Sequence, residues 1–259
     1  MRTVPSTILV VTLMLMSCDL PFEPGPMPRD IIPTSYTPAM NILGVIRVDG
    51  NAGNSYVYIQ RTMTTEEIYS FDIDPTVTQA LVRIREEQGG LESQRFFSHS
   101  ADTNARGMYR DSLFLPQSGK TYALHISAPE YPDISATTRV PVLPEIDSTR
   151  LILEDQHLEF TLRQDTSAFR YNLYLVFDTQ ILEREINGAT TMDLPIHWNW
   201  EASLGTPLEL TIAASDENLT RYGSTSTALL PNTYHDDGST VGGGYGCFGS
   251  VAVQTFSLQ

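Results

Sequence analysis

Lysine is almost missing from this sequence, and positive charge as a whole is scarce. The 259 residues include 31 acidic side chains but only 16 lysines and arginines, and Lys120 is the single lysine. The formal net charge is therefore −15, with an isoelectric point near 4.6. A surface of this sign repels nucleic acid and anionic lipid headgroups, which argues against both as direct partners. Hydrophobic residues at 41% and charged residues at 18% predict a globular protein.

A long apolar run is also missing. The run Ile8–Met16 would cover about 13 Å as a helix, far less than the roughly 30 Å of a bilayer's hydrocarbon core. Behind the positive charge of Arg2, such a run is typical of a secretory signal peptide. The residues that follow, "LMSC", resemble a bacterial lipobox. We therefore predict a lipoprotein signal peptide over residues 1–17 and a lipid on Cys18, with an ordinary signal peptide cleaved further on as the alternative.

Cysteine occurs only twice, at Cys18 and Cys247. With a lipid on Cys18, Cys247 has no partner within the chain, so no intramolecular disulfide is expected. The lipid would hold the protein in the cell envelope, most readily at the outer membrane, on its periplasmic or its outer face. Residues 18–39 include six prolines between Asp19 and Pro38, which predicts an extended tether between the anchor and the folded part.

Beyond the tether, short alternations of apolar and polar residues, separated by turn residues, indicate strands. Apolar residues occupy every second position in segments such as "TQALVRIREE", "GKTYALHISAP" and "HLEFTLRQ". This pattern predicts an all-β protein of two tandem antiparallel β-sandwich domains, immunoglobulin- or fibronectin-like, over residues 40–143 and 144–259. A proline-containing break, "PVLPEIDST", marks the boundary. Within the domains we expect a tyrosine corner at Tyr122 and a short helix that begins after Asp216.

Motifs of established catalytic or metal chemistry are lacking. The five histidines stand singly in the sequence: His99, His125, His157, His197 and His235. None belongs to an H-x-H or H-E-x-x-H motif, and no G-x-S-x-G motif occurs. We therefore expect no catalytic residues, no metal ion and no cofactor. Two carboxylate pairs, Asp72 with Asp74 and Asp236 with Asp237, could supply calcium ligands, but the twelve-residue calcium loop is missing and solvated turns are favoured.

Two tryptophans, Trp198 and Trp200, stand two residues apart in "HWNW". Side chains with this spacing point to one face of a strand. If they are exposed, they form a platform on which a sugar ring stacks, and if they are buried, they belong to a sandwich core. The core interpretation is favoured because aromatic side chains fill such cores.

Glycine is concentrated in "GGGYGCFGS", whose five glycines are Gly242, Gly243, Gly244, Gly246 and Gly249. A phosphate-binding glycine loop lies between a strand and a helix, whereas an alternating segment, "SVAVQTFSLQ", follows here, so phosphate binding is disfavoured. We predict a structural return over Gly242–Gly249 that leads into a closing strand, Ser250–Leu258. Tyr245 and Phe248 would fill the end of the core, with Cys247 as an inert apolar side chain.

The same glycine segment, together with "PTVTQALVRI", "GKTYALHI" and "PEIDST", resembles the bacterial lipoproteins grouped as domain of unknown function 4249, found in Bacteroidota and relatives. The resemblance spans about residues 40–259. It implies no catalytic residues. Because members often lie beside TonB-dependent receptors, it also implies an accessory role at an outer-membrane transport receptor.

Two functions remain open on this basis. The expected one is a non-enzymatic, lipid-anchored envelope protein that binds an outer-membrane transport receptor. The alternative is a glycan-binding or adhesive surface lipoprotein that uses Trp198 and Trp200.

Overall fold

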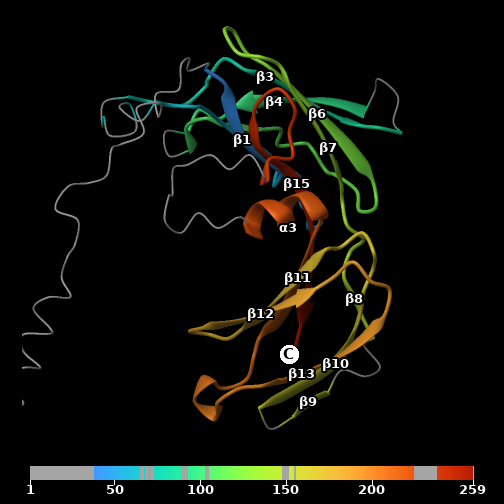
Figure 1. Cartoon of the computed structure of the whole chain (residues 1–259). Coiled ribbons are helices and arrows are strands. Elements are labelled where there is room, and N and C mark those ends of the chain that lie inside the picture. Colours follow the sequence, from blue (N-terminus) through green and yellow to red (C-terminus); the bar gives the residue numbers. More distant parts are fainter. Residues whose placement is uncertain are drawn as a thin grey trace, which may run out of the picture. The chain divides into compact units, whose positions relative to one another are not determined.

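Strands make up most of the chain that the computed structural model describes (Figure 1). The described residues are 38–64, 67, 70, 73–88, 93–102, 105–147, 152–154, 156–224 and 238–258. The predicted signal peptide, Cys18 and nearly all of the tether lie outside them, as do Asp72, His235 and the pair Asp236 and Asp237. From Pro38 onward the chain forms one compact unit.

Alternating side chains build the strands of the first half. These strands are β1 (Met40–Val48), β2 (Tyr56–Arg61), β3 (Leu81–Glu86), β4 (Gln94–His99), β5 (Met108–Arg110), β6 (Thr121–Ser127) and β7 (Ile134–Arg139). In β6, Tyr122, Leu124 and Ile126 are buried, and the side chains between them are half-buried. This confirms the predicted alternation.

The second half supplies the remaining described strands. They are β8 (Glu145–Ile146), β9 (Ile152–Glu154), β10 (His157–Arg163), β11 (Arg170–Val176), β12 (Ile181–Asn187), β13 (Asp193–Asn199), β14 (Glu209–Ser215) and β15 (Tyr245–Ser257). In β10, Leu158, Phe160 and Leu162 are buried, as the alternation predicts.

Within the residues that the structure describes, two short helices accompany these strands. The helix η4 spans Ala202–Leu204 and α3 spans Glu217–Ser224. The helix predicted after Asp216 is thus confirmed. None of the helices in the described part of the chain has the length and apolar character needed to cross a bilayer.

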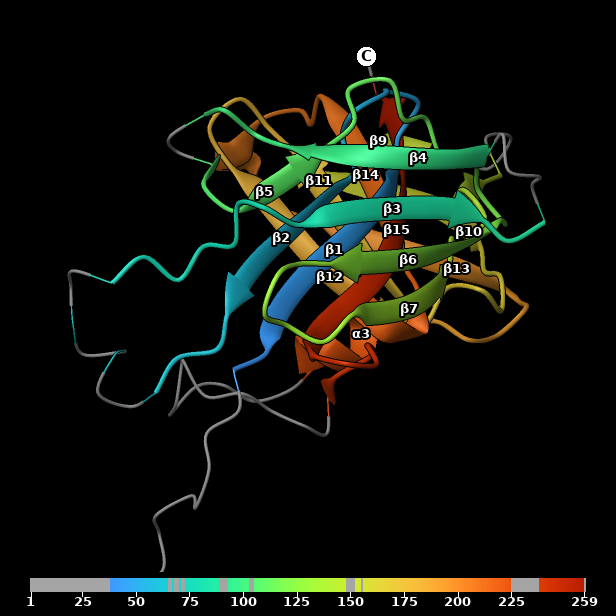
Figure 2. The same cartoon turned by 90° about the horizontal axis from the view of Figure 1, so that it is seen from above.

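Of the described strands, eleven form one sheet in the order β12-β11-β14-β15-β1-β2-β5-β4-β3-β6-β7. The short strand β5 links β2 to β4, and the sheet folds back there. As a result, β4, β3, β6 and β7 lie over β2, β1 and β15 (Figure 2). Apolar side chains between these two layers form the first core, which includes Ile46, Val57, Ile84 and Leu124.

A second sandwich forms from the other end of the same sheet. The strands β13-β10-β8 form a separate sheet, in which β9 also pairs with β10. Side chains from this sheet and from β11 and β14 make up the second core: Leu158 and Ile196 share it with Leu173 and Ile212. The all-β, sandwich-like architecture predicted from the sequence is therefore confirmed.

The last strand, β15, belongs to both halves (Figure 1). It pairs in parallel with β1 through residues 245–252 and antiparallel with β14 through residues 251–257. The predicted division into residues 40–143 and 144–259 therefore needs a correction, because Phe248 packs in the first core. The parallel pair with β1 also departs from the expected all-antiparallel pairing.

Tyrosine hydroxyls fix the loops that precede two strands. The Oη atom of Tyr122 accepts a hydrogen bond from the Gln117 amide at 2.9 Å, which confirms the predicted tyrosine corner. In the second half, Tyr171 Oη accepts a bond from the Asp165 amide at 2.8 Å in the same manner. A buried tyrosine hydroxyl needs a partner, so each bond holds its loop against a core.

Candidate functional site

Both tryptophans pack on the second core. Trp198 is 8% exposed and points inward from β13. Trp200 lies just beyond β13 and is half-buried, with its ring edge-on to Phe177 at 5.7 Å between ring centroids. Its Nε1 donates a hydrogen bond to the carbonyl oxygen of Gly205 at 2.9 Å. The pair therefore does not form an exposed stacking platform, which fits the favoured core interpretation.

The glycine-rich return is shorter than predicted. The strand β15 begins at Tyr245 rather than at Ser250, so only residues 242–244 precede it. Phe248 fills a core as expected, but this is the first core, whereas Tyr245 is half-buried.

Two glycines within β15 explain why its first half does not alternate. Gly246 has a φ of +106°, and a β-carbon there would overlap the carbonyl oxygen of Ile42 on β1. At Gly249, a β-carbon would lie 2.8 Å from the β-carbon of Leu219 on α3. The missing side chains let β1 and α3 pack directly against the β15 backbone.

Cys247 lies between these glycines and is fully buried. Its Sγ contacts the carbonyl oxygen of Asn218 on α3 at 3.6 Å. Burial raises the pKa of this thiol to about 12. Because the thiolate is the reactive form, Cys247 is an inert side chain of the interior, as the sequence predicts.

Asp216 caps α3 and joins a buried polar network. Its Oδ1 accepts a hydrogen bond from the Leu219 amide at 2.9 Å, which is the bond expected of an N-cap. Its Oδ2 bonds to Thr138 Oγ1 on β7. Thr138 Oγ1 in turn lies 3.0 Å from Ser250 Oγ on β15, and Ser250 Oγ lies 3.0 Å from the carbonyl oxygen of Arg139. The network thus ties the helix to both strands.

The hydroxyl groups of this network donate toward Asp216 and toward the backbone of β7. Thr138 Oγ1 donates to Asp216 Oδ2, and Ser250 Oγ donates to the carbonyl oxygen of Arg139. Burial, the largest influence, raises the pKa of Asp216 above its ordinary value of 3.8, although its hydrogen bonds oppose this shift.

Replacing Asp216 tests the network. We expect Asp216→Ala to lower the free energy of unfolding by about 2–3 kcal/mol, because it removes a helix cap worth about 1 kcal/mol and the buried hydrogen bond between Asp216 and Thr138. Urea unfolding of the two proteins measures this difference. A difference below about 0.5 kcal/mol, the range of ordinary surface substitutions, would show that the network is not formed.

The contribution of Asp216 to the free energy of unfolding depends on pH in a defined direction. The pKa of Asp216 is raised in the folded protein, so its contribution to stability is fully present below about pH 3.8 and is lost as the pH rises through the folded pKa. Asp216→Asn removes this titration while keeping the side-chain shape. The free energy of unfolding of the wild type minus that of Asp216→Asn should therefore fall as the pH rises above about 4. A difference that stays constant with pH would contradict a raised pKa of Asp216 in the folded protein.

A polar pocket opens beside this network. Its lining includes Thr121, Thr138, Arg139, Ser167, Asp216 and Asn218. The described lining residues offer hydroxyls, carboxylates and one guanidinium, with no histidine or cysteine among them. The pocket is therefore a hydrogen-bonding surface.

A cluster of three ligand-type side chains forms on the outer face of the four-stranded sheet. His157 and Glu159 come from β10 and His197 from β13, and the ladder places Glu159 directly opposite His197. Glu159 Oε2 lies 3.4 Å from His197 Nδ1 and 3.7 Å from His157 Nε2. The two imidazole rings stack at 6.0 Å between centroids, 20° from parallel.

A fourth residue orients this His157–Glu159–His197 cluster. Asn199 faces His157 in the ladder, and its Oδ1 lies 2.7 Å from His157 Nδ1. Because an amide oxygen only accepts, His157 Nδ1 donates to Asn199, and Nε2 is the ring nitrogen that faces Glu159. The motif search missed the cluster because only the register of β10 against β13 brings the two histidines together.

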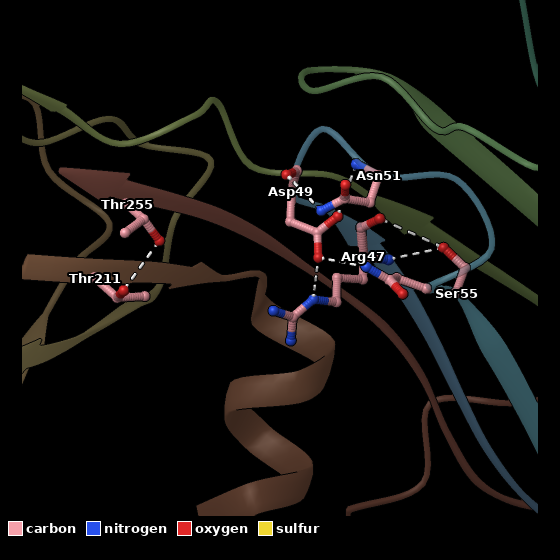
Figure 3. A network of polar contacts seen from close by, with 7 residues as sticks. Arg47, Asp49, Asn51, Ser55, Thr211 and Thr255 are labelled. Atoms are coloured by element: carbon pink, nitrogen blue, oxygen red, sulfur yellow. Dashed lines mark hydrogen bonds and ion pairs between the residues drawn. The ribbon is translucent and has the colours of Figure 1, made fainter. Parts of the chain in front are cut away.

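Asp49 organises the loop 49–54 of the first half (Figure 3). Its carboxylate accepts hydrogen bonds from Arg47 Nε at 2.7 Å, the Asn51 amide at 3.0 Å and Asn54 Nδ2 at 2.7 Å. Burial alone would raise the pKa of Asp49, but these bonds hold it below its ordinary value. The loop is therefore fixed around an ionised carboxylate.

The loop 49–54 supports a second loop, residues 111–116, which we call the leucine loop. The Gly53 amide donates a hydrogen bond to the Phe114 carbonyl at 3.0 Å, and the Phe114 ring is buried in the first core. On either side of it, Leu113 is 73% exposed and Leu115 56% exposed. The sequence analysis did not single out these leucines, because nothing in the alternation shows that they point outward.

Comparison with solved structures finds similarities of low identity. The FN1–FN3 domains of chicken CNTN1 are 10% identical, with 86% of this chain and 67% of that chain covered and a TM-score of 0.28. A two-domain fibronectin type III segment from chicken tenascin is 8% identical, with 85% and 98% covered and a TM-score of 0.22. A DUF3823 family protein from Bacteroides ovatus is 12% identical, with 68% and 89% covered and a TM-score of 0.23. Comparison with curated proteins gives no match.

The sequence profile of one family covers nearly the whole folded unit. The match extends over residues 30–257. The glycine segment and the motifs of the first half resemble the same family. The chain therefore belongs to the family described as domain of unknown function DUF4249.

Proposed function

We propose that this protein is a non-enzymatic, lipid-anchored protein of the cell envelope that binds an outer-membrane transport receptor, such as a TonB-dependent receptor. Binding would use the leucine loop, residues 111–116, together with the loop 49–54. The observation that carries the proposal is the exposure of Leu113 and Leu115 on a backbone already fixed by hydrogen bonds.

Exposed leucines on an ordered loop suit a protein partner. Covering a leucine side chain contributes about 1.5–3 kcal/mol when it is fully removed from water. An ordered loop also loses little conformational entropy on binding, so more of that gain becomes affinity. The net charge of −15 favours a neutral or basic patch on the partner.

The N-terminal sequence supports the anchored part of the proposal. The signal peptide would end at residue 17, Cys18 would carry the lipid, and residues 18–39 would form the tether. At about 3.1 Å per residue in an extended proline-rich chain, the tether reaches up to roughly 60 Å. A partner embedded in the same membrane is within this distance.

Capture from native membranes tests the proposed partner. The full-length protein is cross-linked in its own envelope, purified, and the co-purifying proteins are quantified by mass spectrometry. We expect an outer-membrane receptor to be enriched, and the double variant Leu113→Ser, Leu115→Ser to recover at least about tenfold less of it, a change of about 1.4 kcal/mol. Ile181→Ser removes an equally exposed apolar side chain on β12 and serves as the control. Recovery of no envelope receptor, or equal recovery with both variants, would refute the proposal.

The anchor has its own test. We expect Cys18→Ala to release the protein from membranes, because a chain of net charge −15 is repelled by anionic headgroups and the lipid is then the whole anchor. Fractionation after a high-salt wash measures the release. Continued sedimentation of the variant with the membranes would contradict lipidation at this cysteine.

The alternative, a glycan-binding or adhesive role, depended on exposed tryptophans. Trp198 is buried and the Nε1 of Trp200 is bonded to the backbone. We therefore do not propose a glycan site at these residues.

A further inference from the structure

We propose that His157, Glu159 and His197 form a binding site for a divalent transition-metal ion of the zinc class. The site lies on the outer face of the second sandwich. Its assignment is independent of the proposed function. Its three side chains are 33%, 40% and 56% exposed, so an ion in solution can reach them.

The distances between the ligand atoms fit a single ion. Zinc bonds to imidazole nitrogen and carboxylate oxygen are about 2.0–2.2 Å long, so tetrahedral neighbours lie about 3.3–3.5 Å apart. The separations from Glu159 Oε2 are 3.4 Å to His197 Nδ1 and 3.7 Å to His157 Nε2. All three ligand atoms lie within 4.8 Å of one another. Small rotations of exposed side chains therefore complete the geometry.

The orientation of His157 suits a metal ligand. Its Nδ1 lies 2.7 Å from Asn199 Oδ1, and this contact directs Nε2 toward Glu159. An oxygen that accepts a proton from the other ring nitrogen is the usual outer partner of a metal-bound histidine.

The donor set selects the kind of ion. Two imidazole nitrogens and one carboxylate oxygen suit zinc and its transition-metal neighbours, whereas calcium and magnesium prefer oxygen ligands alone. Three protein ligands leave a fourth position of a tetrahedral ion for water or an external donor. The site is thus open on its solvent side.

The surrounding charges are mixed. Arg184 on β12 donates a hydrogen bond to the His197 carbonyl oxygen at 2.9 Å, and its positive charge weakens the attraction for a cation. Glu154 on β9 lies opposite His157 in the ladder, and its negative charge strengthens the attraction for a cation. The net charge of −15 further raises the local concentration of cations.

Calorimetric titration with zinc tests the site. The full chain is purified without a polyhistidine tag and carries Cys18→Ala, so that the thiol of that residue cannot bind the ion. We expect one zinc ion per chain, and at least about tenfold weaker binding in His157→Ala, His197→Ala and Glu159→Gln. Asn199→Ala, which changes only the outer partner, should weaken binding by about tenfold. Cobalt in place of zinc should give the visible absorption of a tetrahedral site.

His125→Ala is the matched control, because His125 on β6 is a half-exposed histidine paired with Asp133 at 3.4 Å, away from the cluster. It should bind zinc like the parent. Thermal unfolding in the presence of a chelator checks that each variant is folded. Absence of zinc binding, binding unchanged by His157→Ala and His197→Ala, or displacement of zinc by equimolar calcium would overturn the proposal.

Discussion

Removal of residues 242–259 is expected to unfold both halves of the protein. The deletion takes away β15, which pairs with β1 over residues 245–252 and with β14 over residues 251–257. It also removes Phe248 from the first core and the packing of Phe256 on the second. Two strand edges and two apolar interiors would then face water, so the truncated protein should aggregate. Light scattering and thermal unfolding of the purified protein measure the outcome.

A shorter truncation provides the matched control. Removing residues 255–259 keeps every described pair between β15 and β1 but takes away the last three pairs with β14. Hydrogen exchange should then show a protected β6 in the first half and faster exchange in β10 and β11. A soluble 1–241 fragment with a protected first half would contradict the shared strand.

The second large effect is expected at Gly246. Gly246→Ala should lower the free energy of unfolding by about 2–4 kcal/mol, the sum of a positive-φ penalty of about 1 kcal/mol and a steric cost of about 1–3 kcal/mol. The φ of +106° and the overlap with the carbonyl oxygen of Ile42 are the two causes. Urea unfolding of the full-length variant measures the change.

Alanine substitutions at two other glycines separate the backbone penalty from the steric cost. Gly119 has a φ of +75° with nothing within 4 Å of a β-carbon, so Gly119→Ala should show the backbone penalty alone. At Gly242, where the nearest atom to a β-carbon lies at 3.7 Å and φ is not in the left-handed region, alanine should be nearly neutral. If Gly246→Ala costs no more than Gly119→Ala, β1 does not pack against the β15 backbone as described.

The alternating strands could be predicted because each has one buried face. In β6 and β10 every second side chain enters a core, and this leaves a period of two in the sequence. The edge strand β12, "ILEREIN", could not be predicted, since most of its side chains are exposed and only Leu182 and Ile186 in it pack on the second core. The polar β7, "ISATTR", was missed for a related reason, because Thr138 is buried to serve the hydrogen-bond network.

The predicted start of β15 was wrong because glycine occurs both in turns and inside strands that another backbone approaches closely. Gly246 and Gly249 were interpreted as parts of a return, whereas they lie inside a strand that is covered on both faces. Nothing local distinguishes the two cases, since the elements that approach these glycines, the paired strand β1 and the helix α3, come from other parts of the chain.

The His157–Glu159–His197 cluster shows a similar limit. A motif search compares residues a few positions apart on one strand or helix, and it finds only His157 and Glu159 on β10. His197 joins them through the ladder between β10 and β13, whose register no single segment determines. The favoured burial of Trp198 could be predicted because it depended only on the fold class.

The pairing of the first described strand with the last has a consequence for how the chain folds. Asn41 meets Tyr245 across about 200 residues, so this contact is among the most remote in sequence that the chain contains. The strand β1 is therefore synthesised about 200 residues before its partner β15. Until then the β1 edge stays open, and the first core lacks Phe248. Folding of the first core must therefore wait until β15 is available, which predicts slow folding.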